Sequence, residues 1–227
     1  TNWGYEITSD EFESWIQDET GDWISLDKPP MVVCHPSKKG PRSSLVGACR
    51  LFRQLEACHL VFRIDRETSG VVLIAKNRET ASRLQRTVEK RNVHKEYIAI
   101  LAGELSEKVT VEVPLGRDLE SPIVAKQAGT ADGKTALTVF EPRAAAGGLT
   151  LVRVGMTTGR QHQIRAHAEW MKHPVIGDKI YGVPPDLFLT FIEVGWTERH
   201  DALLAHRRQA LHARRVTFDL PDGPLCL

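Results

Sequence analysis

Apolar and β-branched runs alternate with polar turns along most of this 227-residue chain. The runs predict strands at residues 22–27, 60–64, 71–75, 97–101, 109–113, 135–140, 149–154 and 211–218. Two stretches have helical character instead. Residues 79–92 place Ala81, Leu84 and Val88 on one face, and residues 161–172 form a second segment that ends before Pro174. Many strands with few helices between them predict an α+β fold with a mixed, mainly antiparallel sheet and flanking helices.

No internal repeat or low-complexity tract divides the sequence. We expect a single catalytic domain at residues 23–227, preceded by an acidic N-terminal extension at residues 1–22. The segment 141–148 (EPRAAAGG) is either a linker or a hairpin loop, and its short length favours the loop. We also expect a monomer.

Composition excludes several classes of protein. With 41% hydrophobic and 26% charged residues, the chain is neither disordered nor fibrous. No apolar run approaches the roughly 20 residues of a membrane helix, and no signal peptide is visible, so we expect no membrane partner. We expect an intracellular protein, in the cytoplasm of a bacterium or in an organelle or the nucleus of a eukaryote.

The net charge of +1 conceals an uneven distribution along the chain. Residues 1–30 carry eight acidic side chains and one basic, a net −7, whereas residues 31–100 carry 14 basic and six acidic, a net +8. A basic block of this kind is compatible with binding to nucleic acid.

Two other chemistries are rejected. Residues 128–135 (AGTADGKT) match a phosphate-binding loop, but an alternating, strand-like segment follows instead of the required helix, so we expect a hairpin turn at Asp132 and Gly133. The four cysteines contain no C-x-x-C pair, and the histidines lack metal-ligand spacing. We therefore expect reduced thiols and no metal.

The segment FRIDRETSG, residues 62–70, places Asp65 between Arg63 and Arg66 at the end of an apolar run. Alternation puts Arg63 and Asp65 on the side opposite Ile64. A guanidinium close to a carboxylate keeps it ionised even when it is partly buried, which suits a nucleophile. The sequence alone leaves a structural ion pair before a turn as the second interpretation.

The segment GRQHQIR, residues 159–165, precedes the second predicted helix. Arg160 and Gln161 are expected at the helix start, where free N–H groups favour anions. Arg165 either belongs to a functional site or forms an exposed helix pair with Glu169.

Four separated segments resemble the RluA-type pseudouridine synthases: FRIDRETSGVVLIAK, VHKEYIAILAG, GRQHQIRAHAEWMKHPVIGDKIYG and RRQALHA. They lie in the family's order, and the resemblance covers residues 23–218. Two positions depart from its pattern. This chain has Phe62 where members usually have His before the Arg, and Met31 follows Lys28-Pro29-Pro30 where a Gly is usual.

The resemblance implies a role for each matching residue. Asp65 matches the catalytic aspartate, Tyr97 the tyrosine that stacks on the uracil and serves in proton removal, and Arg165 the basic residue that pairs with the aspartate. Arg63 matches the arginine that helps to displace the target base, and Ile164 the apolar residue packed beside the pair. Further residues expected to bind substrate are Arg66, Arg160, His162 and Gln163.

The implied activity is conversion of uridine to pseudouridine in structured RNA, either rRNA or tRNA, without a cofactor. A flipped-out base costs a few kcal/mol, and an aromatic face under it recovers about 1–3 kcal/mol. Phosphate contacts are expected from basic residues between Lys38 and Lys95 and from Arg207, Arg208, Arg214 and Arg215. The alternatives are an RNA-binding protein of the same fold without catalysis and, less in keeping with the basic block, an enzyme acting on small nucleosides.

Overall fold

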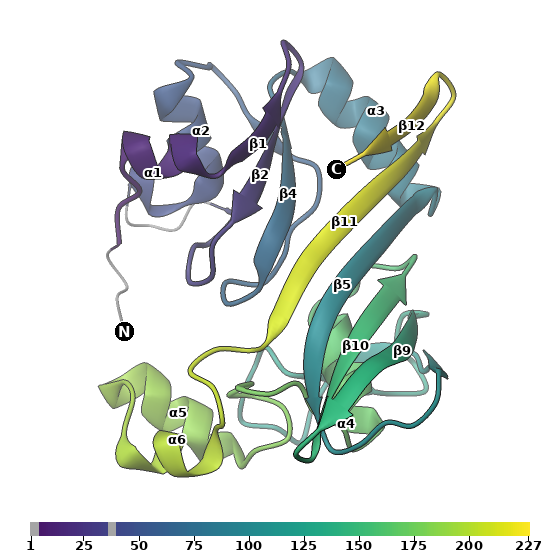
Figure 1. The fold of residues 1–227 in the computed structure, drawn as a ribbon. Coiled ribbons are helices and arrows are strands. Elements are labelled where there is room, and N and C mark those ends of the chain that lie inside the picture. The colour runs from purple at the N-terminus through teal and green to yellow at the C-terminus, as the bar shows by residue number, and fades with distance from the viewer. Residues whose placement is uncertain (1–4, 36–39) are drawn as a thin grey trace. The chain divides into compact units, whose positions relative to one another are not determined.

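The computed structural model describes residues 5–35 and 40–227 (Figure 1). They form two compact units, where the sequence predicts one catalytic domain. The N-terminal unit comprises residues 2–95 with 213–227, and the central unit comprises residues 96–212. Lys38 and Lys39, which are among the predicted phosphate contacts, lie outside the described residues, as do the first four residues of the predicted extension.

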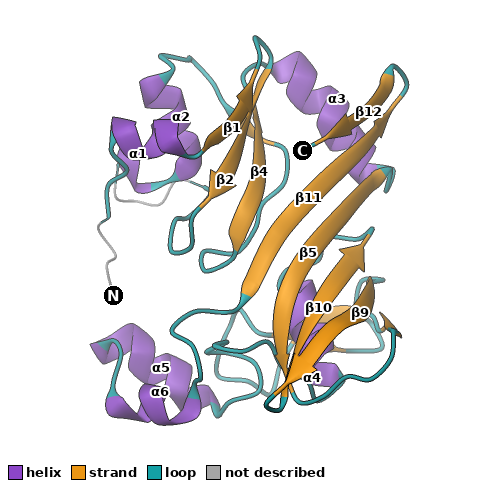
Figure 2. Ribbon diagram, viewed as in Figure 1, coloured by secondary structure: helices purple, strands orange, loops and turns teal. Residues whose placement is uncertain are grey.

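The N-terminal unit is built on antiparallel strands with helices beside them (Figure 2). Its strands are β1 (Ile16–Glu19), β2 (Trp23–Lys28), β3 (His59–Leu60), β4 (Ser69–Ala75), most of β11 (Leu211–Leu220) and β12 (Gly223–Cys226). Its α-helices are α1 (Ser9–Ser14), α2 (Leu45–Phe52) and α3 (Arg78–Glu89). The strand order is β1-β2-β4-β11, with β3 paired to β4 and β12 to β11.

The core of this unit forms around β4, whose seven residues are all buried. Such a strand appears in sequence as an unbroken apolar run, which is why residues 71–75 are easily predicted. Residues from the predicted extension also enter the unit. A Thr8–Glu11 capping box starts α1, Phe12 of α1 is fully buried, and β1 pairs with β2. The predicted boundary at residue 22 stays a prediction.

The central unit contains most of β5 (Val93–Ala102), β6 (Val109–Glu112), β9 (Leu137–Ala146) and β10 (Leu149–Met156) in the order β5-β10-β9-β6. A separate two-stranded sheet pairs β7 (Leu115–Arg117) with β8 (Gln127–Gly129). Its helices are α4 (Gln163–Trp170), α5 (Pro185–Val194) and α6 (Glu198–Leu203). The predicted α+β class, with a mixed, mainly antiparallel sheet and flanking helices, is confirmed.

Two predicted strands and one predicted loop differ from the structure. The one at 60–64 ends at Leu60, because after the Val61 N–H bonds the Leu73 carbonyl the chain departs from β4. The segment 141–148 is mostly strand, and its hairpin turn is confined to Gly147 and Gly148. The last predicted strand, at 211–218, is followed by a two-residue turn and β12.

The expected turn near Asp132 is confirmed. The Gly133 N–H donates to the Thr130 carbonyl at 3.0 Å, and strand β9 follows shortly afterwards. The backbone therefore lacks the helix that a phosphate-binding loop requires.

Gly70 allows the first test of this fold. Its φ is +110°, and a Cβ there would overlap the carbonyl oxygen of Ala213 on β11. We expect Gly70→Ala to lower the free energy of unfolding by roughly 3 kcal/mol, because the backbones at Gly70 and Ala213 would have to move apart. Urea denaturation followed by tryptophan fluorescence measures this. Gly21→Ala is the matched control, since a Cβ at Gly21 meets nothing within 4 Å; equal losses in the two variants would contradict the prediction.

Candidate active site

Asp65 lies in the loop that joins β3 to β4 in the N-terminal unit. Its carbonyl accepts from the Thr68 N–H at 3.2 Å, which closes a turn. Ile64 before it is buried, Arg63 is exposed, and Asp65 and Arg66 are half-buried. Ile64 therefore faces the interior while Arg63 and Asp65 face the other way, as expected, although the segment is a loop and not a strand. Arg63 and Asp65 reach solvent from a loop with a buried anchor.

Lys28 ties this loop to the end of β2. Its side chain is fully buried, and the ammonium donates to the carbonyls of Pro29 and Val32 at 2.9 Å and of Arg66 at 3.1 Å. A buried ammonium without partners would cost several kcal/mol, so these bonds hold the loop firmly. Lys28 is not among the site residues expected from the sequence, where its only signal is its place in the Lys-Pro segment.

Met31 strengthens the same connection. Its N–H donates to the Arg66 carbonyl at 2.8 Å, and Arg66 Nε donates back to the Met31 carbonyl at 3.3 Å. Met31 has a φ of +73°, the left-handed region that favours glycine. The departure from the family's usual Gly therefore falls at the position where the backbone needs one, and it adjoins the Asp65 loop.

Phe62 covers a buried lysine. The Lys95 ammonium lies 5.1 Å from the centre of the Phe62 ring, and Phe62 also packs against Phe218 with centroids 6.2 Å apart. Burial lowers the pKa of Lys95 to about 8. Beneath the loop, Cys34 Sγ donates to the Ile64 carbonyl at 3.5 Å, and burial raises the pKa of this thiol. Cys34 is therefore a structural group and not a nucleophile.

In the central unit, Arg165 forms a buried bidentate ion pair with Asp178. The Nε–Oδ2 distance is 2.6 Å and the Nη2–Oδ1 distance is 2.9 Å. Asp178 also accepts from the backbone N–H groups of Ile180 and Tyr181, and the Arg165 guanidinium lies 5.0 Å from the Tyr181 ring centre. These contacts fix the guanidinium plane.

Of the two interpretations of Arg165, the structure excludes the exposed pair with Glu169. Arg165 is only 5% exposed, and Glu169 instead accepts from Lys126 at 3.2 Å and from the Gly182 N–H at 2.9 Å. The Asp178 partner was missed by sequence reasoning. Its signal was the turn-forming GDKIYG segment, 13 residues beyond Arg165.

The start of α4 differs from the prediction by two residues. The helix begins at Gln163, so Arg160 and Gln161 precede it, and His162 is the N-cap with a φ of 54°. The buried Gln163 amide explains the shift: its oxygen accepts from the Arg160 N–H at 3.0 Å and the Thr158 hydroxyl at 2.9 Å. The Arg160 N–H is thus bound within the unit and is not free for an anion.

The other expected residues near α4 lie around this turn. His162 Nδ1 hydrogen-bonds the Tyr181 hydroxyl at 3.1 Å, and Arg160 Nε donates to the Thr135 carbonyl at 3.0 Å. Ile164 is buried beside Arg165 on the same helix. The structure therefore brings Arg160, His162, Gln163, Ile164 and Arg165 together in one segment of the central unit.

The expected catalytic residues are divided between the units. Asp65, with Arg63 and Arg66, belongs to the N-terminal unit, whereas Tyr97 and Arg165 belong to the central unit. Tyr97 lies in β5 and is 5% exposed. The roles assigned to these three side chains by resemblance stay predictions.

Within residues 5–35 and 40–227, no group of three or more His, Cys, Asp or Glu side chains is arranged to hold a metal ion. His167, for example, hydrogen-bonds Thr138 Oγ1 and the Val113 carbonyl, and burial lowers its pKa. Over the same residues, no helix has the length and apolar character needed to cross a membrane.

The family model described as RNA pseudouridylate synthase matches residues 22–170. Ribosomal large subunit pseudouridine synthase D of Vibrio vulnificus is 32% identical over 208 residues, covering 89% of this chain and 62% of that protein. Its namesake in Xanthomonas campestris is 33% identical over 201 residues, covering 86% and 58%. This chain thus spans about three fifths of the length of these relatives.

Two human structures share the fold. RNA pseudouridylate synthase domain containing 1 has a TM-score of 0.72 at 23% identity, covering 93% of this chain and 81% of that one. RNA pseudouridylate synthase domain containing 4 has a TM-score of 0.73 at 20% identity, covering 96% and 88%. These likenesses confirm the predicted fold class.

The buried Lys95 makes stability depend on pH. Its pKa, about 8 in the folded protein, lies below the usual 10.5, so its burial penalty is present below pH 8 and disappears as the pH rises to about 10.5. We expect Lys95→Met to raise the free energy of unfolding at pH 7 by about 2 kcal/mol, since the lost Phe62 contact offsets part of the gain.

Urea denaturation at pH 7 and pH 10 checks this, and the gain should shrink toward zero at the higher pH. Lys108→Met, at an exposed position, is the control for general alkaline effects. A gain that is the same at both pH values would show that packing and not charge is responsible.

Proposed function

Because this chain belongs to the RNA pseudouridylate synthase family and is of the RluA type, we propose that it isomerises uridine to pseudouridine in structured RNA. The proposed nucleophile is Asp65. The observation that carries the proposal is the Asp65 loop itself. A half-buried carboxylate between two arginines stands on a turn that the buried Lys28 ammonium holds by its backbone.

The arrangement of this loop supports a reacting carboxylate. Rigid backbone anchoring through the Arg66 carbonyl limits movement of the neighbouring Asp65. The arginines on either side of Asp65 in the sequence are proposed to favour its ionised form, and its partial burial reduces its hydration. An ionised and weakly hydrated carboxylate is a better nucleophile than one in bulk water.

The proposed reaction needs no net gain or loss of atoms. Asp65 attacks the uridine, either at ribose C1′ or on the uracil ring, and the N1–C1′ bond breaks. The uracil turns, a C5–C1′ bond forms, and the proton on C5 is transferred to N1 through a base and solvent while Asp65 is released. Tyr97 is proposed to stack on the uracil and to assist removal of that proton.

Arg165 is proposed to keep Asp65 charged and oriented. The bidentate contact with Asp178 supports this proposal, because it holds the guanidinium plane and leaves little rotational freedom. Arg63 is proposed to help displace the target base. A large ribosomal RNA is the proposed substrate, since relatives such as the Vibrio vulnificus protein are named as large-subunit pseudouridine synthases.

A catalytically inactive RNA-binding protein is the second candidate. It would need the basic surface, but binding alone gives no reason to retain a carboxylate among RNA phosphates. The presence of Asp65, Tyr97 and Arg165 in one chain therefore favours the enzyme.

Substitution of the nucleophile tests the proposal. We expect Asp65→Asn to reduce pseudouridine formation more than about 10³-fold, because the amide keeps the shape but not the charge. The readout is tritium release from ribosomal RNA transcripts that contain 5-tritiated uridine, with sites mapped by carbodiimide-dependent primer extension. Glu67→Gln, the same change in the same loop, is the control and should stay active. Activity in Asp65→Asn, or none in a wild-type protein that binds the RNA, would sink the proposal.

To test the proposed role of Arg165, the substitution must leave the buried Asp178 carboxylate with a positively charged partner. Arg165→Lys keeps a positive charge near that buried carboxylate, whereas a neutral residue would leave it without its partner. We expect kcat to fall by about 10- to 100-fold while RNA affinity changes less than about twofold, since only the bidentate geometry is lost. Single-turnover kinetics and RNA titration separate the two. Arg153→Lys, in a half-exposed ion pair on β10, is the control; a parallel fall in affinity would argue against a positioning role.

A further inference from the structure

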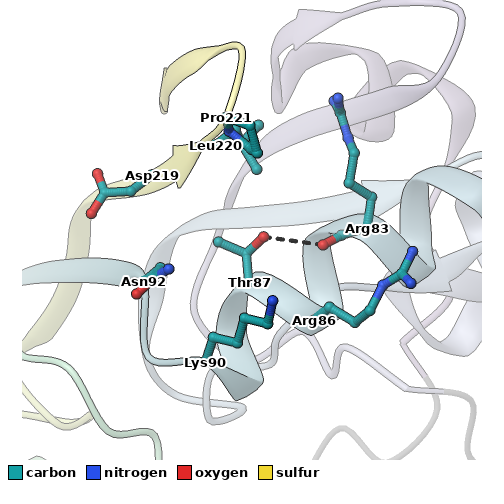
Figure 3. A pocket seen from close by; sticks show the side chains of 8 residues that line it. All are labelled: Arg83, Arg86, Thr87, Lys90, Asn92, Asp219, Leu220 and Pro221. Carbon is teal, nitrogen blue, oxygen red and sulfur yellow. Dashed lines mark hydrogen bonds between the residues drawn. The ribbon is translucent and has the colours of Figure 1, made fainter.

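A hollow in the N-terminal unit lies between α3 and the β11–β12 turn, with a volume of about 460 Å³ (Figure 3). One side is formed by Arg83, Arg86 and Thr87 of α3 with its C-cap residue Lys90, and the other by Leu220 and Pro221. All of these residues belong to the same unit. The volume suits a nucleotide-sized group and not a folded macromolecule.

The three cations share one face of α3. Their spacings of three and four residues place them beside one another on a helix. Arg83 pairs with Asp222 at 3.0 Å. Arg86 Nε donates to the Ser82 carbonyl at 3.2 Å, and neither Arg86 nor Lys90 forms an ion pair with any residue that the structure describes. Two uncompensated cations thus border a concave surface.

The helix C-terminus explains only part of this arrangement. Its partial negative charge favours cations in the last turn, which accounts for the presence of Lys90 and Arg86 near the end of α3. It does not account for a hollow that also contains a Thr87 hydroxyl and the Asn92 side chain. The Thr87 hydroxyl donates its proton to the Arg83 carbonyl at 3.0 Å, so the guanidinium, ammonium and amide N–H groups are the donors that match the oxygens of a phosphate.

One anion also lines the hollow. Asp219 on β11 hydrogen-bonds His94 at 3.1 Å, and Figure 3 shows its carboxylate directed away from the α3 side chains. The positive groups therefore dominate the α3 side. This side is where an anionic ligand would bind.

We propose that this hollow binds a phosphodiester segment of the RNA substrate, through Arg86 and Lys90. The proposal rests on the proposed function, because RNA is the polyanion that this function supplies. It places the contact at the end of α3, immediately before β5, the strand that carries Tyr97. Arg83 is already paired with Asp222 and contributes less. Such a site attracts the phosphates of the RNA backbone and does not distinguish one base from another.

The test removes both uncompensated cations. Binding of a short fluorescein-labelled RNA hairpin, with uridines in its loop, is measured by anisotropy over a range of salt concentrations. We expect the double variant Arg86→Gln, Lys90→Gln to raise Kd about tenfold. The slope of log Kd against log salt concentration should also fall by about 1 to 2.

The control is Arg117→Gln with Lys108→Gln, which removes one arginine and one lysine at exposed positions of the central unit. It should change Kd by less than about twofold, since nonlocal charge is screened by salt. Equal Kd values for the pocket and control variants would overturn the proposal. A loss of thermal stability in the pocket variant without a change in RNA binding would also overturn the proposal. The two cations would then serve only to stabilise the C-terminus of α3.

Failure of this inference and failure of the proposed function give different results. If wild-type protein forms pseudouridine and the pocket variant binds RNA as the control does, only the pocket assignment fails. If wild-type protein forms none, yet the pocket variant loses affinity and the control does not, the RNA site stands and the isomerase proposal fails.

Discussion

The buried ammonium of Lys28 is the contact on which the geometry of the Asp65 loop depends. It links the end of β2 to a segment 38 residues further along, and its hydrogen bonds to the carbonyls of Pro29, Val32 and Arg66 equal the number of donors an ammonium has. Removing a charge from water is costly, so any movement of the loop that broke these bonds would be strongly opposed. The backbone that carries the half-buried Asp65 is thereby kept in place by contacts of its own.

The central unit uses buried charge in a similar way. Arg165 is held by the carboxylate of Asp178, which is itself fixed by the N–H groups of Ile180 and Tyr181. The Asp65 loop is thus held by the Lys28 ammonium and Arg165 by the Asp178 carboxylate, and no sequence pattern shows that these two charged groups are structural. A buried pair of this kind need not add to overall stability, but losing one partner is expensive. Its effect is therefore to define the geometry of the Arg165 guanidinium, which the role proposed for this residue requires.

Local patterns predicted the elements whose structure is decided locally. The apolar run of β4 and the helical spacing of α3 have clear periods, and the predicted bounds differ from the observed ones by a few residues. Helix α2 was not predicted from the sequence. It depends on a Ser44 cap, and on Gly47 leaving room for the Pro41 carbonyl. Asp65 and Arg165 were identified through motifs, whereas Lys28 and Asp178 depend on folded contacts that no local pattern encodes.

The two departures from the family pattern occur where the structure accommodates them. A histidine in place of Phe62 would add a second titratable group next to Lys95, whereas the phenyl ring offers its negative face to the ammonium 5.1 Å away. Met31 adopts the left-handed backbone that a glycine takes more easily, at a cost of roughly 1 kcal/mol. Its N–H still bonds the Arg66 carbonyl. Both substitutions therefore change the surroundings of the Asp65 loop while preserving the hydrogen bonds that position it.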